Sequence, residues 1–192
     1  YDKFDTEKIL AKFNETIAIL HDRLNGMVLL GVCPEEVMAF VESRGESFSI
    51  LIMAELLQAL GKKVRVIDPV KVLVTEGGVM ESSVNIEASK QKYAALEDDV
   101  EAITLMSGFC GGDANGNLVL LGRNGSDYSA ACLAAISNAS CCEIWTDVDG
   151  VYSCDPRAVE GAVLLKKMSY AEAMELSYFG AKVLHPRTIA PI

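Results

Sequence analysis

Hydrophobic positions recur at helical spacing through the first sixty residues. Between residues 6 and 24, apolar side chains lie three and four positions apart, with charged residues between them: Ile9, Leu10, Phe13, Ile17, Leu20 and Leu24. This periodicity predicts an amphipathic helix. Pro34 suits the first turn of a second helix that runs to about Glu42. A third helix is expected over about 47–60, where Gly61 ends it.

After Gly61 the pattern changes to short apolar runs that are rich in β-branched residues. Four of them are predicted strands: 64–67, 103–106, 118–121 and 142–145. Their continuous apolar character is typical of strands that are covered on both faces in a mainly parallel sheet.

Helices are expected between and after these strands. The alanine-rich segment 126–138 is one, and Ser169 with Glu172 forms a capping box for another that runs to about Tyr178. The polar stretch 81–99 is expected to be an exposed excursion that contains a helix. This alternation predicts a three-layer α/β/α sandwich with a mainly parallel sheet and no internal domain boundary.

Composition narrows the classes of function. The chain has 192 residues, of which 51% are hydrophobic, so it can bury a substantial core. A net charge of -10 opposes the phosphate attraction that nucleic-acid binding requires. Six cysteines without Cys-x-x-Cys spacing favour free thiols in a reducing compartment. With neither a signal peptide nor an apolar run of ~18 residues, we expect a cytoplasmic protein with no membrane or nucleic-acid partner.

The segment Gly122-Arg123-Asn124-Gly125-Ser126-Asp127-Tyr128-Ser129 is the strongest functional signal. It places small residues and a cation where a predicted strand gives way to a helix, so that backbone N–H groups and the positive end of the helix dipole can face phosphate. Arg123 offers a fork for carboxylate or phosphate oxygens, and Asp127 can orient a cation or a magnesium-bound water. The alternative is an ordinary turn capped by Ser126 or Asp127.

A second polar segment, Thr146-Asp147-Val148-Asp149-Gly150-Val151-Tyr152, follows the last predicted strand. It resembles half of a calcium loop, but the required register puts Trp145 and Pro156 where carboxylates are needed. A nucleotide site fits better, with Thr146 and Asp147 for the sugar or base and Tyr152 for stacking. The alternative is a polar turn with a buried tyrosine.

Two further segments are ambiguous on their own. Glu46, in Arg44-Gly45-Glu46 between two predicted helices, can capture an ammonium group, although charged residues there are usually solvated. Lys182 follows Gly180 at a predicted helix end, where a lysine often only compensates the helix dipole. His185 before Pro186 is expected to be a packed, hydrogen-bonded histidine.

In order and spacing, these segments resemble the motifs of aspartokinases in the amino-acid kinase superfamily. The match also includes Asp155-Pro156-Arg157 and Ser177-Tyr178-Phe179-Gly180-Ala181-Lys182-Val183-Leu184-His185-Pro186. Asn124 and the lead-in 141–145 resemble the bifunctional, threonine-sensitive aspartokinase/homoserine dehydrogenases of bacteria. The resemblance implies the amino-acid kinase fold and phosphorylation of the β-carboxylate of aspartate by MgATP.

The resemblance also implies a role for each matching residue. Glu46 would bind the substrate ammonium and Arg123 a substrate carboxylate, with Ser126 close by. Asp127 would be the organising acid. The residues implied around ATP are Thr146, Asp147, Tyr152, Arg157 and, near the phosphates, Lys182. Mg²⁺ would arrive with ATP without a direct protein ligand, NADP would belong to the dehydrogenase module, and the parent enzyme would be a homo-oligomer.

Phosphoryl transfer to aspartate needs no general base, because its carboxylate, with a reference pKa near ~4, is already ionised at neutral pH. The barrier is electrostatic, since an anion must approach a polyanion. Arg123, Lys182, Mg²⁺ and the helix terminus at Ser126 are therefore expected to compensate charge and align the reactants, with Asp127 organising the site.

One departure concerns the start of the chain. Family members open with a strand and a Lys-Phe-Gly-Gly-Thr-Ser loop that holds the transferring phosphate, whereas this chain begins Tyr1-Asp2-Lys3-Phe4-Asp5-Thr6. We therefore expect residues 1–192 to be a partial catalytic domain, incomplete at its N-terminus, without the ACT and dehydrogenase modules and with little activity alone. The alternatives are a sister kinase for glutamate, acetylglutamate or a nucleoside monophosphate, and a binding-only module.

Overall fold

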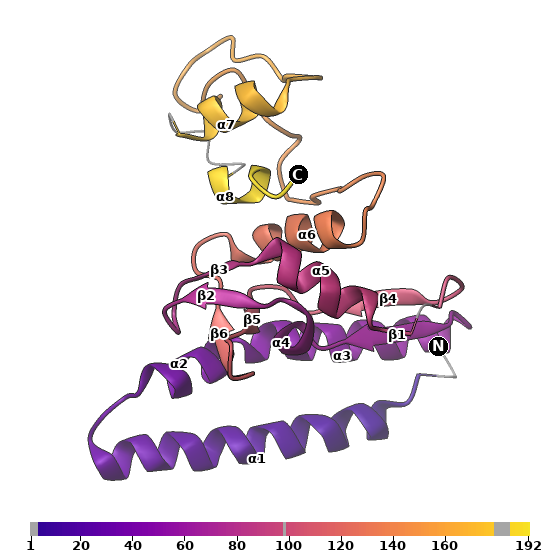
Figure 1. Cartoon of the computed structure of the whole chain (residues 1–192), viewed down its shortest axis with the longest axis vertical. Coiled ribbons are helices and arrows are strands. Elements are labelled where there is room, and N and C mark those ends of the chain that lie inside the picture. The colour runs from indigo at the N-terminus through magenta and orange to yellow at the C-terminus, as the bar shows by residue number, and fades with distance from the viewer. Residues whose placement is uncertain (1–3, 98, 179–184) are drawn as a thin grey trace.

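The computed structural model describes residues 4–97, 99–178 and 185–192 (Figure 1). Three helices lie on one side of the strands: α1 (Thr6–Leu30), α2 (Glu35–Glu42) and α3 (Arg44–Ala59). On the other side lie α5 (Ile86–Ala94) and α6 (Gly125–Ile136), and beyond α6 follow α8 (Pro186–Ile189) and α7 (Tyr170–Tyr178). The short α4 (Pro69–Val72) follows β1 and packs on β5. Helices thus cover both faces of the strand layer.

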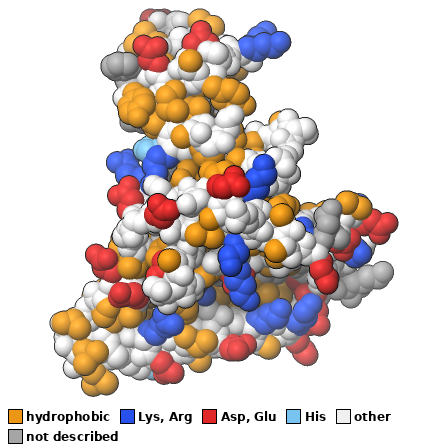
Figure 2. Space-filling view, in the orientation of Figure 1, with side chains coloured by type: hydrophobic (Ala, Val, Ile, Leu, Met, Phe, Trp, Pro, Cys, Tyr) orange, Lys and Arg blue, Asp and Glu red, His pale blue; other side chains and the backbone are white. Residues whose placement is uncertain are grey.

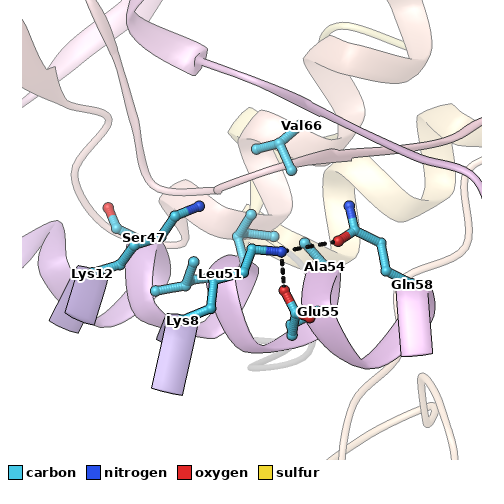
Figure 3. Close-up of a pocket in the computed structure, with 9 residues that line it drawn as sticks. Lys8, Lys12, Ser47, Leu51, Ala54, Glu55, Gln58 and Val66 are labelled. Carbon is cyan, nitrogen blue, oxygen red and sulfur yellow. Dashed lines mark hydrogen bonds and ion pairs between the residues drawn. The ribbon is translucent and has the colours of Figure 1, made fainter. Parts of the chain in front are cut away.

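The first helix is longer than the sequence pattern predicts. The carboxylate of Asp5 accepts a hydrogen bond from the Lys8 N–H at 2.9 Å and caps its start, and Gly31, with φ 66°, ends it. The helix runs on past residue 24 because the next strong terminator is Gly31, which can adopt the left-handed conformation of a helix C-cap. An ion pair between Lys8 and the buried Glu55 joins α1 to α3 (Figure 3).

The second helix is confirmed, but the third begins three residues earlier than expected. Ser43 ends α2 and begins α3, so Arg44-Gly45-Glu46 is the first turn of α3 and not a solvated linker between helices. The Arg44 side chain stabilises this corner, since its Nε donates to the Phe40 carbonyl at 3.0 Å and its Nη2 to Ser43 Oγ at 2.9 Å. Glu46 consequently lies at the positive end of a helix dipole.

The predicted strands β1 (Val64–Ile67) and β4 (Ile103–Met106) form a parallel pair. The predicted third strand, β6 (Leu118–Leu120), ends one residue early and pairs antiparallel with β5 (Cys110–Gly112). A further hairpin joins β2 (Thr75–Gly77) to β3 (Ser82–Val84), and Val74 forms a parallel bridge to Gly112. The α/β sandwich is thus confirmed, with two hairpins that the hydrophobic pattern did not reveal.

The stretch 81–99 contains the expected helix, α5, but it is not an exposed excursion. Ser82 and Val84 are buried, and Ser82 Oγ donates to the Leu120 carbonyl at 2.8 Å. Ser89 of α5 is also buried, and its hydroxyl oxygen accepts from the Val74 N–H at 2.9 Å. Polar side chains can enter the core here because each has a hydrogen-bond partner.

The fourth predicted strand is wrong, because residues 142–145 form no β-ladder with any part of the chain that the structure describes. Trp145 is 88% exposed, and its indole N–H donates to the Glu143 carboxylate at 3.1 Å. An apolar run becomes a strand only where a neighbour can pair with it. The capping box is confirmed, because the Ser169 N–H and hydroxyl both donate to the Glu172 carboxylate, at 2.6 and 2.8 Å.

The largest buried cluster lies between the strands and α6: Ile67, Val72, Leu73, Val84, Leu121, Tyr128, Cys132 and Ile136. It fixes the position of α6 against the strand layer and thereby the turn that precedes this helix. Among the described residues, no helix combines the length and apolar character needed to cross a membrane.

Candidate active site

The turn between β6 and α6 is built from two left-handed residues. Gly122 has φ 75° and Asn124 has φ 54°, and these are residue types that adopt this conformation at low cost. Asn124 is the N-cap residue of α6 but makes no side-chain cap bond. The alternative in which Ser126 or Asp127 caps the helix is therefore wrong, and both side chains lie in the first turn, where they can serve a ligand.

The loop between β4 and β5 packs against this turn. Phe109, between β4 and β5, has φ 71°, and its carbonyl accepts from the Leu121 N–H at 2.9 Å. The Phe109 N–H donates to Ser129 Oγ at 3.2 Å, and Ser129 Oγ donates to the Ser126 carbonyl at 2.8 Å. A Cβ atom at Gly125 would lie only 2.7 Å from the Phe109 ring. The start of α6 is thus tightly packed.

Sequence reasoning missed this supporting loop. Ser107-Gly108-Phe109 has neither a hydrophobic period nor a charged group to mark it. The available signal is Gly108, since a Cβ atom there would come within 3.0 Å of Ser126 Cα. A lone glycine after a strand does not reveal which segment approaches it.

The central contact of the site joins two helix N-termini. Ser126 Oγ in the first turn of α6 donates to Glu46 Oε1 in the first turn of α3 at 2.9 Å, across 80 positions of sequence. Each helix start contributes unpaired N–H groups and a partial positive charge. A carboxylate between two positive helix ends can bind an ammonium group, while the surrounding field favours a second, anionic group.

Arg123 and Asp127 flank this contact. Arg123 is exposed in the turn and Asp127 is half-buried one residue after Ser126. Neither forms a hydrogen bond or ion pair with another side chain in the described ranges, so both remain available to a ligand. Burial first, and then the charges of Cys141 and Asp127, raise the pKa of the Cys142 thiol.

The residues assigned to the nucleotide form a separate group with short-range contacts. Thr146 Oγ1 donates to the adjacent Asp147 carboxylate at 3.2 Å, and the Tyr152 hydroxyl donates to Asp149 at 3.2 Å. The Arg157 N–H donates to Asp155 at 2.9 Å. No hydrogen bond or ion pair links this group to Glu46, Arg123 or Ser126 within the part of the chain that is described.

Tyr152 is half-buried in a short antiparallel ladder. It forms a bridge to Leu164, flanked by hydrogen bonds from the Ser153 N–H to the Val163 carbonyl at 2.9 Å and from the Leu165 N–H to the Val151 carbonyl at 2.8 Å. The bonded partner of the Tyr152 hydroxyl is Asp149.

The structure describes only part of the last predicted segment of the site, 177–186. Lys182 lies outside the described residues. His185 is the hydrogen-bonded residue that the sequence predicts: its Nδ1 accepts from the Arg187 N–H at 3.3 Å and caps α8. The described residues contain no group of three His, Cys, Asp or Glu side chains arranged to hold a metal ion.

With this geometry established, comparison with known proteins identifies the family. The sequence profile described as "Amino acid kinase family" matches residues 7–192. The chain belongs to the amino acid kinase family. It is 50% identical over 191 residues to the bifunctional aspartokinase/homoserine dehydrogenase of Haemophilus influenzae and 53% identical over 190 residues to that of Buchnera aphidicola. These alignments cover 100% and 98% of the chain but only 23% of each relative.

Solved structures agree with this assignment. The chain superposes on Escherichia coli aspartokinase III in complex with aspartate and ADP with a TM-score of 0.87 and 33% identity, over 95% of this chain and 41% of that one. For the complex of the same enzyme with lysine and aspartate, the TM-score is 0.83 and the identity 32%. The amino-acid kinase fold and the resemblance to aspartokinases are therefore confirmed. The chain spans about a quarter of the length of its curated relatives.

Proposed function

We propose that this kinase chain binds aspartate between the starts of α3 and α6, as part of an enzyme that transfers the γ-phosphoryl group of ATP to the substrate's β-carboxylate. The observation that carries the proposal is the hydrogen bond from Ser126 to Glu46, close in sequence to Arg123, which has no side-chain partner among the described residues. It is supported by relatives named as aspartokinases and by a solved relative in complex with aspartate and ADP.

The charges of the site match the charges of an amino diacid. In the proposal, Glu46 binds the ammonium group and Arg123 binds a carboxylate, with Ser126 between them. The pairing is charge-assisted on both ends, which makes each hydrogen bond stronger than a neutral one. A substrate without an ammonium group would leave the Glu46 carboxylate next to ligand atoms that cannot donate to it, so such a substrate should be rejected.

Phosphoryl transfer at this position needs charge compensation and not proton removal. In the proposal, Arg123 and the N–H groups at the start of α6 compensate the charge that the acceptor carboxylate brings to the phosphate. Asp127 is half-buried and unpaired among the described side chains, and it is too isolated to hold a metal ion alone. It suits a water bound to Mg²⁺ that arrives with ATP, and this ion would neutralise phosphate charge. Lys182 completes the proposed catalytic group.

On the nucleotide side, we assign the ribose and base to Thr146, Asp147 and Tyr152, and the phosphates to Arg157 and Lys182. The support is the relative in complex with ADP, together with the capacity of an aromatic ring such as that of Tyr152 to stack on a base. The dehydrogenase chemistry and NADP belong to other parts of the bifunctional relatives. A homo-oligomeric state and a cytoplasmic location stay predictions.

The decisive experiment tests separately the proposed contacts to the ammonium group and to a carboxylate of aspartate. In a longer polypeptide that also carries the Lys-Phe-Gly-Gly-Thr-Ser loop, Glu46→Ala and Arg123→Ala should each weaken the use of aspartate by about 2 kcal/mol or more, because each leaves a substrate charge unpaired. The KM for ATP should stay nearly constant. Glu42→Ala, at the exposed end of α2, serves as a matched control and should change neither constant.

Substrate analogues sharpen this test. N-acetylaspartate keeps both carboxylates but lacks the ammonium group, so the unmodified enzyme should discriminate against it and Glu46→Ala should lose that discrimination. L-Glutamate, N-acetylglutamate and nucleoside monophosphates test the sister kinases. Preferential turnover of any of these over aspartate, or equal losses for ATP and aspartate in the two variants, would refute the proposed assignment. Binding without turnover in the longer polypeptide would indicate a binding-only module.

A further inference from the structure

One guanidinium group lies against both ends of the turn that carries Arg123 and Ser126. Arg187, at the start of α8, donates from Nη1 to the Leu121 carbonyl at 2.7 Å, immediately before the turn. Its guanidinium carbon also lies 4.6 Å from the centre of the ring of Tyr128, the last residue of the 122–128 segment that comprises the turn and the start of α6. The side chain is only 22% exposed.

The same group also binds the neighbouring hairpin. Arg187 Nη2 donates to the Ser82 carbonyl and, at 3.3 Å, to Ser83 Oγ, and Nη1 lies 3.5 Å from the Glu81 carboxylate. Glu81 in turn packs along the turn itself, since a Cβ atom at Gly122 would lie 3.0 Å from Glu81 Cγ. Arg187 therefore joins α8, the β2–β3 hairpin and the turn before α6.

We propose that Arg187 is a positioning residue that fixes the 122–128 turn and so sets where Arg123 and Ser126 meet the amino-acid substrate. The substrate part of this inference rests on the proposed function. The structural part, that Arg187 restrains the turn, does not.

The geometry explains why the turn needs such a restraint. Gly122 and Asn124 provide two left-handed positions inside it, and glycine has more backbone freedom to lose than any other residue. Other contacts also hold its ends, among them the Leu121 N–H bond to Phe109 and the Tyr128 hydroxyl, which accepts from the Val84 N–H at 3.0 Å. Arg187 adds the contacts that join both ends to α8 and the β2–β3 hairpin. A misplacement of about 1 Å in a group that orients a substrate can cost as much as ~100-fold in rate.

Lysine cannot reproduce this arrangement. An arginine side chain offers a planar fork that can bond two carbonyls at once while its flat face covers a ring, whereas lysine is a point charge on a flexible stem. Arg187→Lys therefore keeps the charge and removes the geometry. Arg65→Lys is the matched control, because Arg65 also makes several hydrogen bonds, to Thr104 Oγ1 and the Glu97 carbonyl, but it does so at the β1–β4 pair and not at the turn.

The first measurement is backbone amide hydrogen exchange on the 192-residue chain, which requires no activity. Arg187→Lys should speed exchange at residues 122–128 by about tenfold or more, while Arg65→Lys should leave these amides unchanged. Glu81→Gln is a second variant, which should fold in any case because the side chain is exposed. It should speed exchange at the same amides by a smaller factor than Arg187→Lys does. Unchanged protection of residues 122–128 in both Arg187→Lys and Glu81→Gln would overturn the proposal.

The second measurement is steady-state kinetics of the longer polypeptide. Arg187→Lys should raise the KM for aspartate by about tenfold and change the KM for ATP by less than twofold. Equal changes in both constants, or an equal effect of Arg65→Lys on the aspartate KM, would show a general structural role and overturn the inference. If the unmodified enzyme does not phosphorylate aspartate but the exchange result holds, the proposed function fails while the restraint by Arg187 stands.

Discussion

The two halves of the predicted site differ in how far apart in the sequence their bonded partners lie. At the start of α6, Ser126 binds Glu46 across 80 positions, and Arg187 reaches Leu121 across 66. In the segment 143–157, the side-chain hydrogen bonds given above join residues no more than three positions apart.

This difference has a physical consequence. The part-buried contacts of Arg187 and Phe109 with the 122–129 segment break only when several elements separate, so they hold this segment in one geometry before the ligand arrives. Local contacts between exposed residues persist even when the segment moves as a whole. We therefore expect the amino-acid half to be more fully preorganised by the fold than the nucleotide half.

The largest expected contrast between the halves is in cysteine reactivity. Burial raises the pKa of Cys110 to about 11 and that of Cys132 to about 12, whereas Cys141 and Cys154 are exposed in the second half. A rise from 9.0 to about 12 lowers the thiolate fraction of Cys132 about 1,000-fold at pH 8. The greater nucleophilicity of a high-pKa thiolate offsets part of this loss, while burial also hinders access to the sulfur. Iodoacetamide should therefore modify the exposed Cys154 faster than Cys132 by about two orders of magnitude or more, as measured by peptide mass spectrometry.

Unfolding provides the control for this experiment. In concentrated urea the buried thiols should regain ordinary pKa values and react at similar rates. Comparable rates for Cys132 and Cys154 in the folded chain would show that the first half opens as readily as the second, and the comparison would fail.

The next largest effect is expected from a methyl group at the start of α6. Gly125→Ala places Cβ 2.7 Å from the Phe109 ring and should destabilise the fold by about 3 kcal/mol, since the surrounding backbone must shift. Gly26→Ala is the control: it lies inside α1 with no atom within 4 Å of the new Cβ, and it should stabilise the chain by about 1 kcal/mol. Urea denaturation measures the free energy of unfolding of both variants. If Gly125→Ala lowered it by no more than an ordinary surface substitution does, tight packing at the start of α6 would be contradicted.

The smallest effect is expected at the nucleotide. If the chain keeps its fold, adenine nucleotide should bind with a high micromolar to millimolar Kd, because stacking on Tyr152 and a few hydrogen bonds contribute only ~1 kcal/mol each. The exposed Trp145 offers a fluorescence signal next to the segment. The triple variant Thr146→Ala/Asp147→Ala/Tyr152→Ala should lose this binding, with Glu160→Ala as a control, and unchanged saturable binding would place the pocket elsewhere.

The sequence by itself determined the elements whose signals are local. The β-branched runs of β1 and β4 and the Ser169–Glu172 capping box formed as predicted, because each depends on residues within a few positions. The three helices before Gly61 also formed, although α1 ends later and α3 begins earlier than the hydrophobic spacing indicates. The motif Gly122 to Ser129 also identified the turn that begins α6. Local backbone preferences and hydrophobic spacing were sufficient for these features.

Only the tertiary structure decided which of these elements meet. It showed that Glu46 lies in the first turn of α3, where it accepts a hydrogen bond from Ser126, and not in a linker. It also showed that Phe109 and Arg187 contact the segment at the start of α6. It also left 142–145 without a strand partner among the described residues. Such contacts depend on how whole helices and strands pack. The residues next to a side chain in the sequence therefore do not determine which side chain it contacts 60 or 80 positions away.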